Sequence, residues 1–224
     1  MKILAIIPAR GGSKGIKKKN IKDFGGYPLI YWTIQAAKSS KYIHKTIISS
    51  DDPEIIKIAK KFGCKAPFIR DAKLAQDSSL AIDVTLDVIN RVPGYDWIML
   101  LQPTSPLRSE IDIDKAVETC IEFNSTSCVS ISPVSEKPDW FFTLGNNQNI
   151  KSLLKNPRFV RRQELSDYYK LNGAIYLSNV ETLKKYRSFV NHETVGYVMP
   201  KNRSIDIDDE RDFDQALSYF RSIK

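Results

Sequence analysis

Short apolar runs alternate with amphipathic segments along most of this chain. Residues 3–7 and 96–101 are nearly continuous apolar runs, typical of strands that are buried on both faces of a parallel sheet. Between them, apolar residues recur every three or four positions, as on the inner face of a helix, in residues 29–37, 55–62 and 81–89. This pattern predicts a β-α-β-α order, with residues 3–7 at the centre of the sheet.

The second half of the chain continues the pattern with one interruption. Further strands are expected at residues 45–50, 64–69, 127–134, 171–178 and 195–199. Further helices are expected at 113–121, in a short segment that follows residue 178 and ends at about 186, and at 213–220. Asp77 is expected to begin the third helix, and residues 109–112 resemble a capping box for the fourth. We therefore predict an α/β fold with a doubly wound, mostly parallel sheet and flanking helices, whose ligands gather at the carboxyl ends of the strands.

The interruption lies between about Ser135 and Tyr169. Aromatic and basic residues occur there without a helical period, which indicates a protruding β-rich arm rather than another βα unit. Trp140, Phe141 and Phe142 would form an unusual apolar patch on a monomer, and a second subunit would cover it. We predict an α/β core of residues 1–135 and 168–224 and a dimerisation arm of residues 136–167.

The amino-acid composition limits the classes of protein to which this chain can belong. A chain of 224 residues, 42% of them hydrophobic, can bury a full core as one domain of generous size. No apolar segment approaches the roughly 20 residues of a membrane span, and the first apolar run breaks at Pro8 without a cleavage-like site. We expect a cytoplasmic protein without a membrane partner. The three cysteines lack C-x-x-C spacing and predict buried free thiols.

The formal net charge of +8 suits an anionic ligand. The cations are scattered through the chain, except for residues 17–19 and the group of Arg158, Arg161 and Arg162, and no zinc-finger or RNP pattern accompanies them. This distribution favours small anions over nucleic acid.

A glycine-rich cationic loop follows Pro8. Residues 10–15 offer backbone N–H groups on residues that are free to take positive φ, flanked by Arg10, Lys14 and residues 17–19, as a polyphosphate requires. The spacing matches neither G-x-x-x-x-G-K-[ST] nor G-x-G-x-x-G. A tight βα connection with solvated lysines would account equally well for the loop taken alone.

Asp206 and Asp208 alternate with Ile205 and Ile207 near the end of the chain. On a strand, both carboxylates would face one way, and two carboxylates near a phosphate loop suit Mg²⁺, which phosphates and waters then complete. The alternative is an exposed strand before an acidic helix N-terminus.

Covalent catalysis has little support. His44 and His192, the two histidines, stand in polar connecting segments, and no serine or cysteine lies in a nucleophile elbow. Phosphoryl and nucleotidyl transfer need neither histidine nor a covalent intermediate.

Four motifs stand in order along the chain: IPARGGSKG at 7–15 followed by Lys19-Asn20, LLQPTSPLR at 100–108, NGAIY at 172–176 and SIDID at 204–208. Together they resemble the acylneuraminate cytidylyltransferases, also called CMP-sialic acid synthetases, over essentially the whole chain. The resemblance implies a nucleotide-binding α/β fold whose arm exchanges across a homodimer. It also implies attack by the anomeric hydroxyl of a nine-carbon 2-keto sugar acid on the α-phosphorus of CTP, with Mg²⁺ as cofactor and pyrophosphate as the second product.

The resemblance also assigns roles to single residues. The nucleotide and its phosphates would be held by Arg10, Gly12, Ser13, Lys14, Lys19, Asn20 and Arg70. Gln102, Asn172 and Tyr176 would line the sugar pocket, and Arg162 would reach the carboxylate or a phosphate through the arm. Asp206 and Asp208 would bind Mg²⁺, and the residues expected to be catalytic are Arg10, Lys19 and Asp208.

Two positions depart from the family pattern. Lys17 stands where members often have proline, and Ala81 stands where many have a hydroxyl residue, so no nucleotide contact is assigned to Ala81. The acceptor could be N-acetylneuraminate, legionaminate or pseudaminate, with Kdo disfavoured by the GGSKG and NGAIY segments. A non-catalytic nucleotide- or nucleic-acid-binding protein is the remaining alternative, although two aspartates near a cationic loop would repel a nucleic-acid backbone.

Overall fold

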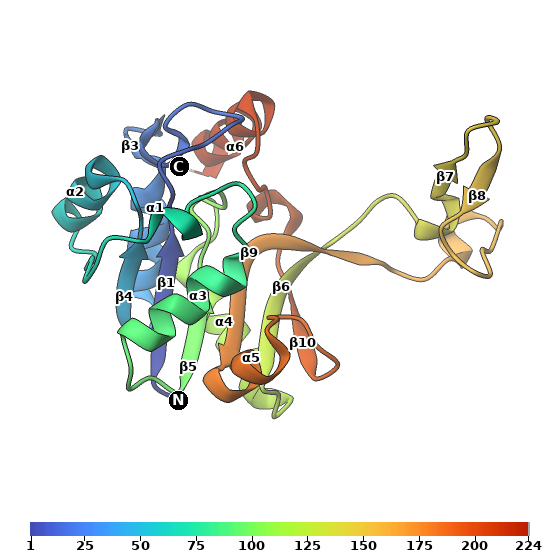
Figure 1. Ribbon diagram of the computed structural model, residues 1–224. Coiled ribbons are helices and arrows are strands. Elements are labelled where there is room, and N and C mark those ends of the chain that lie inside the picture. The colour runs from blue at the N-terminus through green and yellow to red at the C-terminus, as the bar shows by residue number, and fades with distance from the viewer. Residues whose placement is uncertain (224) are drawn as a thin grey trace.

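The computed structural model describes residues 1–223, with all side chains in that range except those of Arg162 and Ile223. Within this range the central sheet has six strands in the order β10-β6-β9-β5-β1-β4 (Figure 1). Their bounds are β1 Ile3–Pro8, β4 Ile43–Ser49, β5 Trp97–Leu100, β6 Ser127–Pro133, β9 Tyr169–Asn179 and β10 Thr194–Val198. The pairs β1–β4, β1–β5 and β6–β10 are parallel, whereas β9 runs antiparallel to both β5 and β6.

Helices cover both faces of this sheet, which confirms the predicted α/β class with a mostly parallel sheet. They are α1 Leu29–Ser39, α2 Pro53–Lys61, α3 Ala81–Arg91, α4 Glu110–Glu122, α5 Val180–Tyr186 and α6 Glu210–Ile223. Alternate residues of β1 enter opposite cores: Ile3, Ala5 and Ile7 pack with α1, α2 and α4, whereas Leu4 and Ile6 pack with α3 and α5. A third cluster joins α6 to Ile207 and to Ile16 of the glycine-rich loop.

Several local predictions were wrong. β1 is fully buried, but it lies next to the edge strand β4 rather than at the centre of the sheet. Residues 64–69 form no strand and make a single bridge, between Ile47 and Lys65, because Pro67 has no N–H to continue a ladder. Helix α3 begins at Ala81 and not at Asp77, and residues 204–208 have no regular secondary structure.

The three cysteines are free and buried, as predicted. Burial raises the pKa of the Cys64 thiol to about 12. No helix within residues 1–223 combines the length and the hydrophobicity that a membrane span needs.

Two small hairpins complete the described chain. β2 Asp23–Phe24 pairs with β3 Tyr27–Pro28 beside α1, and β7 Phe142–Leu144 pairs with β8 Ile150–Ser152. The β7–β8 hairpin stands apart from the sheet, at the end of two long segments that leave β6 and return into β9 (Figure 1). At the root of these segments, the Val134 N–H donates to the Tyr168 carbonyl at 3.0 Å.

Candidate functional site

A cleft of about 430 Å³ opens at the carboxyl ends of β1 and β5. Its walls come from the glycine-rich loop after β1, the loop before α3, the loop after β5 and the segment before α6. The predicted site residues that line it are Arg10, Ser13, Lys14, Lys19, Asn20, Arg70, Gln102 and Asp208. Gly12 belongs to the same loop but is not part of the cleft wall, and Ala81 is.

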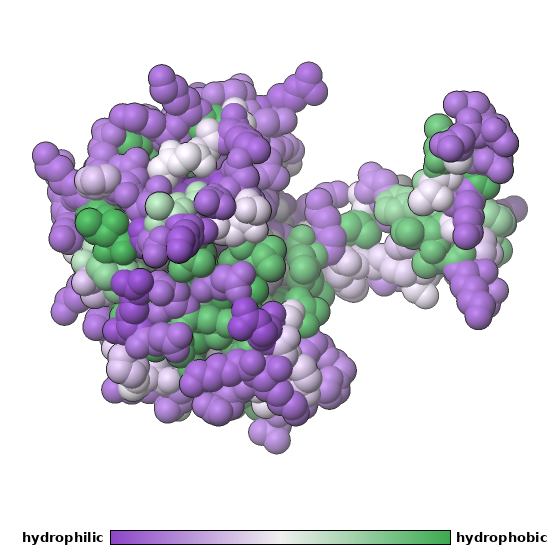
Figure 2. Space-filling model, viewed as in Figure 1, coloured by the Kyte–Doolittle hydropathy of each residue, from purple (hydrophilic) through white to green (hydrophobic). Residues whose placement is uncertain are grey.

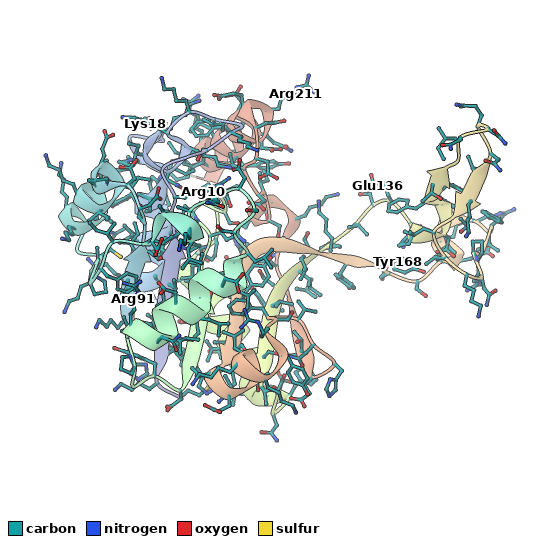
Figure 3. The ribbon with its side chains drawn as sticks, viewed as in Figure 1. Arg10, Lys18, Arg91, Glu136, Tyr168 and Arg211 are labelled. Carbon is teal, nitrogen blue, oxygen red and sulfur yellow. The ribbon has the colours of Figure 1, made fainter. Side chains whose placement is uncertain are left out.

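Hydrogen bonds hold the glycine-rich loop in place. The Gly11 N–H donates to Asp51 Oδ1 at 3.0 Å, and Asn20 Nδ2 donates to the Arg10 carbonyl at 3.0 Å. Asn20 is buried. Its side-chain amide holds the loop through this hydrogen bond, and the residue also borders the cleft. The Arg10 side chain points from this loop toward the middle of the site (Figure 3).

Arg70 forms a buried cation in the wall of the cleft. Its Nε donates to Ser49 Oγ at 3.0 Å, and Nη2 donates to the Ser49 carbonyl at the end of β4. Burial lowers the pKa of Arg70 to about 10, so the guanidinium stays charged at neutral pH. A fixed positive charge in a partly desolvated wall favours an anionic ligand.

The exposed cations of the loop meet a carboxylate that the sequence analysis placed elsewhere. Asp77 was expected to cap α3, but its carboxylate forms ion pairs with Arg10 and Lys14, each at 2.6 Å. Hydrogen bonds from Lys14 and Arg10 keep the pKa of Asp77 below its usual value. No local sequence signal distinguishes this use of Asp77 from a helix cap.

Lys19 connects the glycine-rich loop to the segment that carries the paired aspartates. Its Nζ donates to the Ile207 carbonyl at 2.6 Å and lies 4.0 Å from Asp208 Oδ1. Gly15 completes the contact, since a Cβ at that position would collide with the Asp208 backbone oxygen. The two halves of the predicted site therefore touch, although almost the whole chain separates them in sequence.

Asp206 and Asp208 differ in their environments. The Asp208 side chain is 86% exposed, whereas Asp206 is partly buried and its Oδ1 has no hydrogen-bond partner among the described residues. Burial, with a smaller contribution from the Asp208 charge, raises the pKa of Asp206, while Thr104 and Lys19 act in the opposite direction. A buried carboxylate oxygen without a donor fits a cation.

The donor set indicates which cation. No group of three or more His, Cys, Asp or Glu side chains that could hold a metal ion occurs in residues 1–223, so the described protein offers a pair of carboxylates and not a complete cage. Mg²⁺ is commonly held by one or two carboxylates and completed by substrate phosphates and waters. Asp206 and Asp208 are therefore the residues that could hold it.

The predicted sugar-binding residues are divided between two other cavities. Gln102 and Tyr176 share a cavity of about 250 Å³ with Arg187 and Phe189, which the sequence analysis did not identify. Gln102 and Ala81 line both this cavity and the cleft, so the two adjoin. The side chain of Arg162 lies outside the described part of the structure, and its backbone belongs to a short helix, Arg162–Glu164, in the projecting segment.

Asn172 lies elsewhere. It borders a third cavity, of about 630 Å³, together with Asp206 and Asp208. Its buried amide accepts from Ser130 Oγ at 2.6 Å and donates to Ser204 Oγ at 3.0 Å. In this arrangement Asn172 holds the aspartate segment and does not face Gln102 and Tyr176.

Comparisons with known proteins show the family of the chain. A family described as Cytidylyltransferase matches residues 4–223. The chain is 36% identical to a CMP-N,N'-diacetyllegionaminic acid synthase of Legionella pneumophila, over 93% of this chain and 91% of that protein. It is 35% identical to a pseudaminic acid cytidylyltransferase of Campylobacter jejuni, over 99% and 97%. It is 34% identical to an N-acylneuraminate cytidylyltransferase of Streptococcus agalactiae, over 98% of this chain but only 53% of that longer protein.

Solved structures share the fold at low sequence identity. A CMP:2-keto-3-deoxy-manno-octonic acid synthetase complexed with CTP superposes with a TM-score of 0.76 at 18% identity, and the match covers 100% of both chains. A 4-diphosphocytidyl-2C-methyl-D-erythritol synthase of Anaerococcus prevotii gives 0.68 at 16% identity, over 98% of both.

Proposed function

Because this chain belongs to the cytidylyltransferase family of nucleotidyltransferases, we propose that it transfers CMP from CTP to a nine-carbon 2-keto sugar acid, with release of pyrophosphate. The observation that carries the proposal is the contact of Lys19 with both Ile207 and Asp208, which joins the glycine-rich loop to the aspartate segment at the edge of the cleft. Two relatives over which the chain aligns almost completely are named for legionaminic acid and for pseudaminic acid.

The cationic wall binds the triphosphate in this proposal. Arg10, Lys14 and Lys19 neutralise the phosphates and stabilise the charge that develops on the leaving pyrophosphate, while Ser13 adds a hydroxyl donor. Gly12 lets the backbone approach the phosphates. Asn20 and Arg70 lie beside the nucleoside part of the substrate.

The aspartate pair supplies the sites for a metal. We propose that Asp206 and Asp208 hold Mg²⁺, which when bound neutralises phosphate charge as a Lewis acid. Asp206 provides the orphan buried oxygen, and Asp208 is exposed where the cleft and the 630 Å³ cavity meet.

The sugar acid enters from the cavity that adjoins the cleft. Gln102 and Tyr176 would orient it, so that its anomeric oxygen bonds to the α-phosphorus as the bond to the bridging oxygen of pyrophosphate breaks. The proton of the anomeric hydroxyl passes to solvent water in this step. Asn172 and Arg162 remain proposed contributors, the first through the aspartate segment and the second from the arm.

The projecting hairpin supports a dimer. We propose that residues 136–167 exchange between two copies of the chain and that residues 1–135 and 168–224 form the nucleotidyltransferase core. Large apolar side chains gather on the hairpin and its supporting segments (Figure 2). The exposed ones are Trp140, Phe141, Phe142, Leu144, Ile150, Leu153 and Phe159. A second copy of the chain would cover this patch.

An assay of pyrophosphate release tests the reaction. Purified protein is given CTP, Mg²⁺ and, in turn, N-acetylneuraminate, legionaminate, pseudaminate and Kdo. We expect release with at least one nine-carbon acid and none with Kdo. Asp208→Asn should reduce kcat by about 100-fold or more, because the Mg²⁺ that neutralises the phosphate charge would lose one of its two proposed carboxylate ligands.

Asp214→Asn is the matched control. Asp214 is exposed on α6 and lines neither the cleft nor the 630 Å³ cavity, so this variant changes the net charge equally and should keep its activity. Full activity of Asp208→Asn, or no release with any nine-carbon acid, would contradict the proposed function.

A further inference from the structure

Asp77 is the acidic residue that faces Arg10 and Lys14, two cations of the glycine-rich loop. It lies between Arg70, which is anchored to β4, and the start of α3, and it lines the cleft. A turn fixes its backbone, since the Ser79 N–H donates to the Gln76 carbonyl at 3.1 Å and Ser79 Oγ donates to the Lys73 carbonyl at 3.0 Å. The carboxylate is therefore held at the cleft by the fold of its own loop.

The two contacts of Asp77 use separate oxygens. Oδ1 lies 2.6 Å from Arg10 Nη1, and Oδ2 lies 2.6 Å from Lys14 Nζ. One carboxylate thus bridges two cations in the manner of a phosphate group with two oxygens. Both cations are residues that the proposed function assigns to the triphosphate.

We propose that Asp77 is a specificity-determining residue, an internal counter-ion that competes with the terminal phosphates of the nucleotide for Arg10 and Lys14. This inference rests on the proposed function, since it concerns the same cations. A ligand with a diphosphate or triphosphate carries enough charge to displace Asp77. A ligand with a single phosphate next to the nucleoside does not reach both cations and leaves the bridge intact.

The competition favours turnover. Cations that stabilise a leaving pyrophosphate also bind it tightly, and tight binding of a product slows its release. When pyrophosphate leaves, Asp77 can return to Arg10 and Lys14, so the two cations are not left unpaired. Specificity that is built by an opposing group within the protein is a general device for separating related ligands.

The expected change in affinity for pyrophosphate follows from the solvent exposure of these side chains. The side chains of Lys14 and Asp77 are 78% and 47% exposed and that of Arg10 is 33% exposed, so both ion pairs remain accessible to solvent. Two such pairs, at the modest strength that exposed pairs have, correspond to about a fivefold difference in the affinity of a competing ligand.

Calorimetric binding to Asp77→Asn tests the inference. The probes are inorganic pyrophosphate and CMP, each with Mg²⁺ and at constant ionic strength, because salt screens surface charges. We expect the Kd for pyrophosphate to fall about fivefold in the variant, as removal of two opposing surface pairs allows, while the Kd for CMP stays unchanged. Asparagine keeps the shape of the side chain and removes only its charge.

Glu54→Gln is the matched control. Glu54 forms an ion pair of the same length, 2.6 Å, with Lys18 of the same loop, but neither residue lines the cleft. This variant should leave both dissociation constants as they are in the wild type.

Three results would overturn the inference: an unchanged Kd for pyrophosphate in Asp77→Asn, weaker binding of pyrophosphate, or equal tightening for CMP and pyrophosphate. Weaker binding would mean that Asp77 positions the cations for the substrate. The measurement needs no turnover, so failure of the proposed reaction, which shows as absent pyrophosphate release by the wild type, is a separate result.

Discussion

Gly173 lies in the left-handed region of backbone conformation, with φ at 76°, directly beside Asp206. A Cβ at this position would stand 2.6 Å from Asp206 Oδ2. The carboxylate therefore occupies space that any other residue at position 173 would fill. The glycine of the NGAIY motif has two reasons to be there: its conformation and the close approach of Asp206.

Gly173→Ala should displace the Asp206 carboxylate. We expect kcat/KM to fall about 100-fold, because a shift of about 1 Å in a site group can cost that much. The Mg²⁺ concentration that gives half-maximal rate should rise as well. Initial rates of pyrophosphate release over a Mg²⁺ titration measure both quantities.

Gly26→Ala separates the clash from the backbone strain. Gly26 also has a positive φ, 91°, but no atom lies within 4 Å of the Cβ position. Both variants should lose about 1 kcal/mol of stability from strain. Only Gly173→Ala should change the Mg²⁺ requirement, and equal requirements in the two variants would disprove the role given to Gly173.

Single residues could be predicted as site residues where a local sequence pattern indicates their role. Arg10, Lys14 and Lys19 follow a buried strand in a glycine-rich context, and Asp206 and Asp208 share one short motif. Asp77 and Gly173 act through contacts with residues that are remote in sequence, and no local pattern encodes such contacts. The alternation of Asp and Ile suggested a strand at 204–208, where tertiary contacts hold an irregular segment instead.

The irregular segment before α6 is fixed by side chains of neighbouring elements. Arg203 donates to both carboxylate oxygens of Asp112, at 3.0 and 2.8 Å, and Asp112 also accepts from the Tyr197 hydroxyl at 2.9 Å. Asp112 itself is fully buried at the start of α4, where it forms a capping box with Ser109. One carboxylate thus ties α4, β10 and the aspartate segment together.

Asp112→Asn should destabilise the protein by about 2–4 kcal/mol at neutral pH, because it leaves Arg203 without its charged partner. Burial acts to raise the pKa of Asp112, but hydrogen bonds from Arg203 and Ser109 outweigh it and keep the pKa below its usual value. The stabilisation is therefore present above the unfolded-state pKa, about 4, and fades as the pH falls through the lower folded-state pKa. Urea unfolding of both proteins from pH 7 to pH 3 should show the difference shrinking.

Glu122→Gln is the control for Asp112→Asn. Glu122 is exposed at the end of α4, so this variant removes an equal charge from the same helix and should shift stability by less than about 0.5 kcal/mol. If the difference in unfolding free energy between Asp112→Asn and the wild type stays constant with pH, the protonation of Asp112 is not linked to stability as expected here.

The order and type of elements could be predicted from hydrophobic periodicity, because each buried strand and each helix face leaves its own local pattern. The direction of β9 could not. Its buried residues carry no signal of strand direction, and its antiparallel course depends on how the chain returns from the β7–β8 hairpin. Similarly, residues 64–69 have the composition of a strand, but Pro67 restricts them to one bridge.

For the whole molecule, the exposed apolar residues of the hairpin predict self-association. Phe141→Ser together with Leu144→Ser should raise the dissociation constant of the dimer about 100-fold or more, because two large side chains would no longer be buried in the interface. Sedimentation velocity over a range of protein concentrations measures this shift.

Phe123→Ser together with Ile121→Ser provides the comparison. Both residues are exposed apolar side chains, but they lie at the end of α4, on the surface of the α/β part of the protein and away from the hairpin. This variant should sediment as the wild type does. A monomeric wild type, or equal dissociation of the two double variants, would exclude the hairpin as the interface.

The hydrogen bond between Val134 and Tyr168 has a consequence for how such a protein can vary. β6 and β9 are already paired at this bond, so the intervening residues form a loop of the sheet as far as strand register is concerned. Insertions, deletions and substitutions between Val134 and Tyr168 leave the register of the central sheet unchanged. The entropy cost of closing this loop also grows only slowly with the length of the loop. The hairpin and the sheet can therefore change in length independently of each other, as far as strand register is concerned.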